Sequence, residues 1–247
     1  MNKTYRDQVI VLYTYPIGEA DRVITMLSRE HGKIRAVAKG VRKTKSRFGA
    51  RLEPFSLIDA QFYIGRTLDV VTQVESLNEY HRAIVTNYER YTAGCAILET
   101  ADQLVADEGV PDLANFVLLH GAIHALAAGA HAPHNVLNSY ILRAMSYAGW
   151  QLAIFECAVC GAPGPHDALS VGAGGAVCSA CRPPASTIPS VETWQLLGAL
   201  SVGDWSIVDA SDATTQNSAA AIISAYLQYQ LEHGINSLKY VNARMIS

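Results

Sequence analysis

The sequence predicts an α+β protein with more than one domain: a closed five-stranded β-barrel first, then an α-helical domain that carries a small four-cysteine insert. Two observations predict this arrangement. Hydrophobic residues alternate with a period of two up to residue 79, and from residue 80 they recur every three or four residues. Two CxxC pairs then interrupt the helical part. The predicted domains are 1–79, 80–155 together with 183–247, and the insert 156–182.

The first 79 residues are expected to form the barrel. Val9, Val11 and Tyr13 share one parity of an apolar run, and glycine and proline turn signals separate it from the runs that follow. Five strands in fewer than eighty residues suit a small barrel of the OB type. The expected strands span about 6–22, 22–30, 33–42, 52–64 and 67–75.

The helical part is expected to begin at Tyr80. Its apolar residues lie at three- and four-residue steps until Gly109-Val110-Pro111 ends the pattern. A second helix should follow to about Ala128, and a third from Pro133 to Gly149. After the cysteine-rich segment, helices are expected near 190–201 and 214–233, the last one ended by Gly234.

Charge is distributed unevenly, although the net charge is only −3. Residues 1–80 contain thirteen Lys and Arg against nine Asp and Glu, whereas residues 81–247 contain six against thirteen. This asymmetry points to a module that binds a polyanion, joined to a part with another task. No run approaches the roughly 18 apolar residues of a membrane helix, and the N-terminal apolar stretch lacks a signal-cleavage site. A cytoplasmic protein is therefore expected.

The four cysteines of the insert predict a metal site. Cys157 and Cys160 form one CxxC pair, Cys178 and Cys181 form the second, and seventeen residues separate the pairs. That spacing is typical of zinc sites, and the glycine-rich segment between the pairs cannot build a core of its own. Four thiolates leave no open position on the ion, so one structural zinc is expected rather than a catalytic one. Two disulfides or unrelated buried thiols are the alternative, but disulfides are disfavoured in a cytosolic chain.

A basic stretch within the barrel predicts contact with nucleic acid. Eight cations and no acidic residue lie between positions 33 and 51. Strand alternation places Ile34, Ala36 and Ala38 in the barrel interior and the neighbouring cations outside. Phe48 in the same segment is interpreted as a base-stacking candidate, and a merely solvated charged surface is the alternative. The candidate DNA-binding residues are Lys33, Arg35, Lys39, Arg42, Lys43, Lys45, Arg47 and Arg51.

Signatures of catalysis are weak. His120 and His124 lie one helical turn apart, as in metalloprotease helices, but Gly121 stands where the HExxH motif has its general base. The sequence contains neither a GxxxxGK[ST] phosphate loop nor a GxSxG nucleophile motif. A binding protein is therefore expected, not an enzyme.

The segment from Gly18 to Ile58 resembles the N-terminal barrel of the RecO family of DNA repair and recombination mediators. It contains the G-E-x-D opening at Gly18–Asp21, the run AKGVRKTKSR at Ala38–Arg47 and an LxPF element at Leu52–Phe55. The helical middle and the CxxC pairs also match, so the resemblance covers nearly the whole chain. At the C-terminus, Leu238-Lys239 is followed by Tyr240-Val241, which departs from the Leu-Lys-Ser-Arg-like end common in that family.

The resemblance implies a function and partners. It implies binding to single- and double-stranded DNA, annealing of complementary strands, contact with the single-strand-binding protein, and cooperation with RecR to load RecA. A nucleoid-associated location in the cytoplasm follows from these roles. Two other classes remain open from the residues alone: an RNA-binding factor with an OB barrel and a zinc knuckle, and a zinc-dependent hydrolase of nucleic acid.

Overall fold

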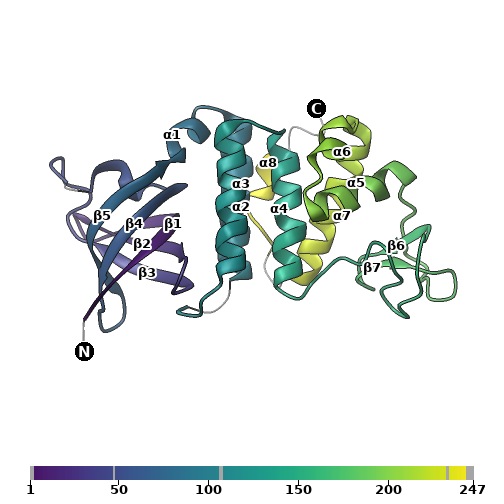
Figure 1. Cartoon of the computed structure of the whole chain (residues 1–247), viewed down its shortest axis with the longest axis horizontal. Helices are drawn as coiled ribbons and strands as arrows, with labels where there is room; N and C mark the ends of the chain where they lie inside the picture. Colours follow the sequence, from purple (N-terminus) through teal and green to yellow (C-terminus); the bar gives the residue numbers. More distant parts are fainter. Residues whose placement is uncertain (1–2, 47, 106–107, 232–233, 243–247) are drawn as a thin grey trace. The chain divides into compact units, whose positions relative to one another are not determined.

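The computed structural model describes residues 3–46, 48–105, 108–231 and 234–242. The chain divides into two compact units, residues 1–128 and 129–247 (Figure 1). The first unit contains a β-barrel and the helices up to residue 128; the second contains the remaining helices and a two-stranded sheet. The helices that follow the barrel in sequence thus form one compact unit with it. The domain boundary expected near residue 79 stays a prediction.

The barrel is closed, with the strand order β1-β2-β3-β5-β4, and β4 pairs back to β1. All pairings are antiparallel except the short parallel contact between β3 and β5. This confirms the five-stranded OB-type barrel. The strands are β1 (Thr4–Ile17), β2 (Asp21–Ser28), β3 (Lys33–Ala38), β4 (Ser56–Tyr63) and β5 (Asp69–Glu79).

Several strand limits differ from the expected ones. β1 ends at Ile17 because Gly18 turns the chain with a φ of 58°. β4 begins four residues later than expected, since Gly49–Leu52 form a short 3-10 turn, η1, in place of strand. Alternation along β3 is as expected: Ile34, Ala36 and Ala38 are buried in the barrel core.

Helices α1 (Tyr80–Val85), α2 (Tyr88–Leu104) and α3 (Leu113–Ala128) complete the first unit, and α2 and α3 pack together (Figure 1). One continuous helix from Tyr80 was expected, and this was wrong. The chain leaves the helical conformation at Asn87, whose side chain accepts a hydrogen bond from Arg90 N at 2.9 Å and so caps α2.

Helix α2 is joined to the barrel at the LxPF element. Phe55 has a left-handed backbone with a φ of 72°, is 1% exposed, and donates its N–H to Val11 O at 3.0 Å. Its ring lies where Gly94 has no side chain: a Cβ at position 94 would come within 2.8 Å of the Phe55 ring. The close approach of α2 to this ring therefore requires glycine at position 94.

The second unit consists of helices α4 (Pro133–Tyr147), α5 (Val191–Val202), α6 (Trp205–Ala210), α7 (Ala213–Gln230) and α8 (Leu238–Asn242), with the hairpin β6 (Ala168–Ser170) and β7 (Gly175–Val177). Helix α5 contacts α4, α6 and α7. Helices α5 and α7 begin within one residue of the expected positions, whereas α6, α8 and the hairpin were not predicted. In the described part of the chain, no helix is both long enough and apolar enough to cross a membrane.

Candidate metal site and nucleic-acid interface

The four cysteines converge in the second unit. The Sγ atoms of Cys157, Cys160, Cys178 and Cys181 all lie within 4.8 Å of one another. The Sγ atoms of Cys160 and Cys178 are 3.8 Å apart, which matches the roughly 3.8 Å between thiolates at 2.3 Å from a tetrahedral zinc. No other group of three such residues in the described ranges brings its ligand atoms together in this way. The site therefore fits a metal ion held by four thiolates.

Tight turns build each CxxC knuckle. Gly161 N donates to Cys157 O at 2.8 Å, and Gly161 has a φ of 71°, so the chain reverses directly after the first pair. In the second pair, Cys181 N donates to Cys178 O at 3.1 Å. The hairpin β6–β7 lies between the pairs and brings them together. Each pair thus lies in a short turn. The hairpin brings the two turns together although seventeen residues separate them in the sequence.

The backbone also favours the thiolate of Cys157. Backbone N–H groups, that of Cys178 first, lower the pKa of Cys157 to about 6, and Cys178 N lies 3.4 Å from its Sγ. The Cys181 thiol instead donates to the neighbouring cysteine sulfurs, first to Cys178, and these hydrogen bonds raise the pKa of Cys181 to about 12. His166 Nε2 is hydrogen-bonded to Ala162 O at 2.9 Å and lies outside the four-cysteine group.

In the barrel, two of the eight predicted cations are neutralised by acidic groups. Lys33 Nζ lies 2.8 Å from the carbonyl oxygen of Asp102 and 3.3 Å from its Oδ1. Arg35 Nη1 is 3.6 Å from Glu108 Oε1, and its Nη2 donates to the Tyr15 hydroxyl at 2.8 Å. Both acidic partners belong to the segment at the end of α2. The start of β3 is therefore charge-compensated.

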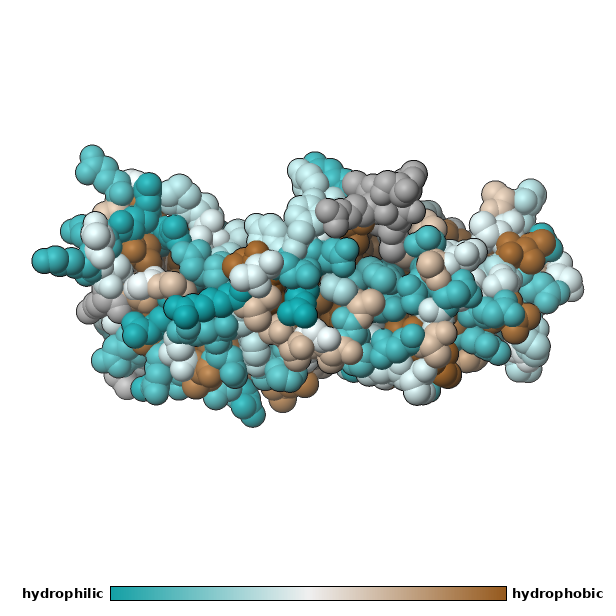
Figure 2. All heavy atoms as spheres, turned by 90° about the horizontal axis from the view of Figure 1, so that it is seen from above, coloured by the Kyte–Doolittle hydropathy of each residue, from teal (hydrophilic) through white to brown (hydrophobic). Residues whose placement is uncertain are grey.

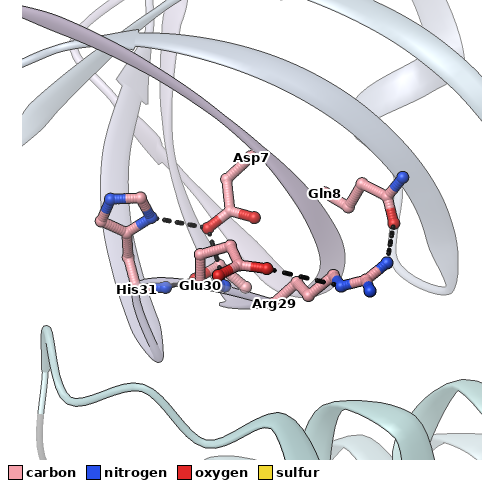
Figure 3. A network of polar contacts seen from close by, with 6 residues as sticks. Asp7, Gln8, Arg29, Glu30 and His31 are labelled. Atoms are coloured by element: carbon pink, nitrogen blue, oxygen red, sulfur yellow. Dashed lines mark hydrogen bonds and ion pairs between the residues drawn. The ribbon is translucent and has the colours of Figure 1, made fainter.

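Positive charge in the turn between β2 and β3 is compensated as well (Figure 3). Asp7, whose side chain is almost wholly buried, accepts hydrogen bonds from Glu30 N at 3.1 Å and from His31 Nδ1 at 2.7 Å. Arg29 points toward Gln8 and Glu30, with its nitrogens 3.4 Å and 3.5 Å from their side-chain oxygens. This end of the barrel offers little uncompensated positive charge.

The opposite end of β3 differs. Arg42 Nη1 donates to a carbonyl oxygen, that of Gly18, at 3.3 Å. Lys39, Lys43 and Lys45 are exposed, and no acidic side chain among the described residues is within ion-pairing distance of them. Arg51 is also exposed, on η1. Arg47 lies outside the described residues.

We call the segment from Lys39 to Lys45 the basic loop. The barrel part of the surface, at the left of Figure 2, is predominantly hydrophilic, with side chains that project into solvent. Flexible, exposed cations of this kind suit contact with phosphates, which carry no sequence information. The arrangement therefore favours binding along a nucleic-acid backbone.

The interpretation of Phe48 as a base-stacking residue was wrong. Phe48 is 2% exposed and belongs to the hydrophobic core of the barrel, so its ring is not available to a base. Exposed aromatic residues that were not proposed for this role lie elsewhere on the barrel: Tyr13 and Tyr15 are 39% and 37% exposed on β1, and Tyr63 is 41% exposed on β4. Parity along β1 groups Tyr13 with the core residues Val9 and Val11, so the sequence pattern carried no signal for an exposed ring.

The paired histidines of α3 make other contacts. His120 Nε2 is 3.0 Å from the Tyr80 hydroxyl, and His124 packs edge-on against the same ring. Burial, with a smaller contribution from His124, lowers the pKa of His120 below its ordinary value. Both histidines therefore pack against Tyr80.

Comparisons with known proteins agree with this architecture. The family model described as Recombination protein O N terminal matches residues 1–80, and the model described as Recombination protein O C terminal matches residues 85–239. The chain is 52% identical over 237 residues to the DNA repair protein RecO of Thermobifida fusca. It is 49% identical over 243 residues to that of Streptomyces coelicolor and 49% identical over 240 residues to that of a Nocardioides species. Each match covers 96% of this chain and 98% of the relative.

Proposed function

Because this chain belongs to the RecO family of DNA repair proteins, we propose that it is a recombination mediator that binds single-stranded DNA through its barrel and anneals complementary strands. One observation carries the proposal: the cations of the basic loop have no acidic partner among the described residues, whereas Lys33 and Arg35 do. A group of uncompensated cations at one end of an OB barrel is suited to a polyphosphate backbone.

The proposed mechanism is electrostatic and involves no chemical step. Each phosphate contacted by a lysine or arginine releases condensed counterions, and this release favours binding. Two complementary strands held on one cationic surface repel each other less, so they pair more readily. The same contacts admit double-stranded DNA, because they read phosphates and not base edges.

The proposal includes one structural zinc, held by Cys157, Cys160, Cys178 and Cys181. Four thiolates would fill the tetrahedral coordination of the ion and leave no position for water. The ion would stabilise the insert, not cleave nucleic acid. On this basis the protein is proposed to be a binding protein and not an enzyme.

The proposal extends to protein partners through the family resemblance. These are RecR, the single-strand-binding protein and, indirectly, RecA. The location that follows is the cytoplasm, in association with the nucleoid.

The test is an annealing assay combined with a salt titration. About five phosphate contacts on a single strand predict that log K falls with log[salt] with a slope of about −3.5. Replacing Lys39, Arg42, Lys43 and Lys45 with alanine should flatten the slope by about 2.8, weaken binding similarly across sequences and slow annealing of DNA coated by single-strand-binding protein. The zinc content should stay that of the parent.

A charge-matched control separates the loop from net charge. Replacing Lys3, Arg6, Arg29 and Arg82 with alanine removes the same number of cations elsewhere in the first unit and should leave the slope near that of the parent. If the loop variant binds and anneals like the parent at physiological salt, the proposal is wrong. Tighter binding of RNA than of single-stranded DNA, or cleavage that depends on a divalent metal, would point to one of the other two classes.

A further inference from the structure

A register shift in β1 determines what the barrel presents on its outer surface. Val11 pairs with Met26, and both side chains lie in the barrel core. The register shifts between Val11 and Tyr13, so that Tyr13 pairs with Thr25 and Tyr15 with Val23. An extra residue at a bulge moves the following side chains to the opposite face of a strand. Tyr13 and Tyr15 therefore point outward although they continue the parity of the core residues.

The cross-strand neighbours of the two tyrosines are buried. Their partners on β2, Val23 and Thr25, are only 1% and 0% exposed. The tyrosine rings are therefore the exposed groups on this part of the sheet. The Tyr15 hydroxyl accepts a hydrogen bond from Arg35 on β3 at 2.8 Å, and this arginine is held in turn by Glu108. The Tyr15 ring is thus fixed from its hydroxyl end while more than a third of the residue stays exposed.

The basic loop contacts the turn that follows β1, the strand that carries both tyrosines. Arg42 donates its Nη1 to Gly18 O at 3.3 Å and its backbone N–H to Ala20 O at 3.0 Å, and both acceptors are in the turn that follows β1. Gly40 N donates to Asp21 Oδ1 at 2.7 Å across the same junction. A strand whose phosphates contact this loop can continue along β1 over Tyr15 and then Tyr13.

The spacing of the rings selects the form of the nucleic acid. Alternate residues of a strand lie on one face about 6.6–6.8 Å apart. Successive bases in a duplex are only about 3.4 Å apart along each strand, and their faces are already covered by their neighbours. Only an unpaired, stretched strand can place one base on each ring.

We propose that Tyr13 and Tyr15 form a base-stacking platform that makes the barrel prefer single strands to duplex DNA. This inference rests on the proposed DNA-binding function and adds the feature that discriminates between the two substrates. The basic loop contacts phosphates in both forms, and the tyrosines contact bases only in one. Aromatic stacking tolerates any sequence, because every base has a π-face.

The experiment compares the affinity for an oligo-dT strand with that for a random-sequence duplex of equal length. Tyr13→Leu and Tyr15→Leu should each weaken single-strand binding about fivefold or more, the lower end expected for the loss of one stacked base. Duplex affinity should change less than twofold, and the salt slope should stay near that of the parent because the phosphate contacts remain. Tyr15→Phe keeps the ring but loses the Arg35 contact, and it should retain most of the single-strand affinity.

Tyr63→Leu is the matched control, because Tyr63 is 41% exposed on β4 and should not affect the ratio of the two affinities. Photo-crosslinking of a strand that contains 5-iododeoxyuridine to the unmodified protein supplies a second measurement without mutation. Crosslinks should map to Tyr13 or Tyr15.

Three outcomes overturn the platform: an unchanged ratio of the two affinities in both leucine variants, an equal loss in the Tyr63→Leu control, or crosslinks that map only elsewhere. If these occur while the basic-loop variant still loses binding, the platform alone is wrong and the proposed function stands. If the basic-loop variant binds normally, the proposed function fails first.

Discussion

Lys33 Nζ lies within hydrogen-bonding distance of both the carbonyl oxygen and the Oδ1 of Asp102, at 2.8 Å and 3.3 Å. The lysine side chain is only 13% exposed, so this contact joins β3 to α2 in a partly buried position. Lys39, just beyond the other end of β3, is exposed and has no acidic partner among the described residues. Under the proposed function, we therefore expect the two lysines to have different roles: Lys33 in stability and Lys39 in DNA binding.

The first prediction separates these roles with a matched pair of variants. Lys33→Ala should lower the free energy of unfolding by about 1–3 kcal/mol, because it removes charge-assisted hydrogen bonds and leaves Asp102 partly buried without them. Its salt slope for DNA should match that of the parent. Lys39→Ala should leave stability within about 0.5 kcal/mol and flatten the slope by about 0.7. Chemical denaturation measures the free energy of unfolding, and a salt titration measures the slope. A flatter slope for Lys33→Ala and a loss of stability for Lys39→Ala would contradict these roles.

The second prediction concerns the metal. One zinc per chain should co-purify with reduced protein, and Cys157→Ser should lose it and make the insert sensitive to protease, because the segment between the pairs has no core of its own. Cys95→Ser is the control, since Cys95 is a half-buried thiol on α2 outside the four-cysteine group. Elemental analysis measures the zinc content per chain in the parent and in both variants. An absence of zinc, or an equal loss in the control, would remove the proposed site.

The third prediction uses two helical glycines. Gly94→Ala should destabilise the protein by about 1–3 kcal/mol, because the new methyl group meets the Phe55 ring in a packed position. Gly121→Ala should instead stabilise it by about 0.5–1 kcal/mol, since a Cβ there meets nothing within 4 Å and alanine favours the helix. Thermal or chemical unfolding shows whether each substitution stabilises or destabilises the protein. Equal effects of the two substitutions would show that α2 does not approach Phe55 so closely.

The fourth prediction is a pH dependence. Burial lowers the pKa of His120, so between this lowered pKa and the ordinary value near 6.5 the unfolded chain binds more protons than the folded protein. Stability should therefore fall as the pH drops through about 6.5. His120→Gln should reduce this fall between pH 7.5 and pH 5 and leave annealing at pH 7.5 unchanged. A variant with the same pH profile as the parent would contradict the burial argument.

Much of the architecture could be predicted from local pattern. Two-residue alternation, then a helical period, indicated the barrel and the helices, since both periods are properties of short segments. The cluster of four cysteines could be predicted because they lie in two CxxC turns, each of which nearly determines its own geometry. The start of α2 could not be predicted in the same way, because the apolar spacing continues through Asn87 and only its capping hydrogen bond breaks the helix.

The proposed nucleic-acid face depends on both levels of structure. The sequence by itself determined that eight cations and no acidic residue lie between positions 33 and 51 of the barrel segment. Only the tertiary structure decided which of them remain uncompensated, because Asp102 and Glu108 reach Lys33 and Arg35 from 69 and 73 positions away in the chain. The burial of Phe48 and the outward direction of Tyr13 likewise depend on barrel closure and on one bulge. Such features arise from contacts between distant segments, and no local period encodes them.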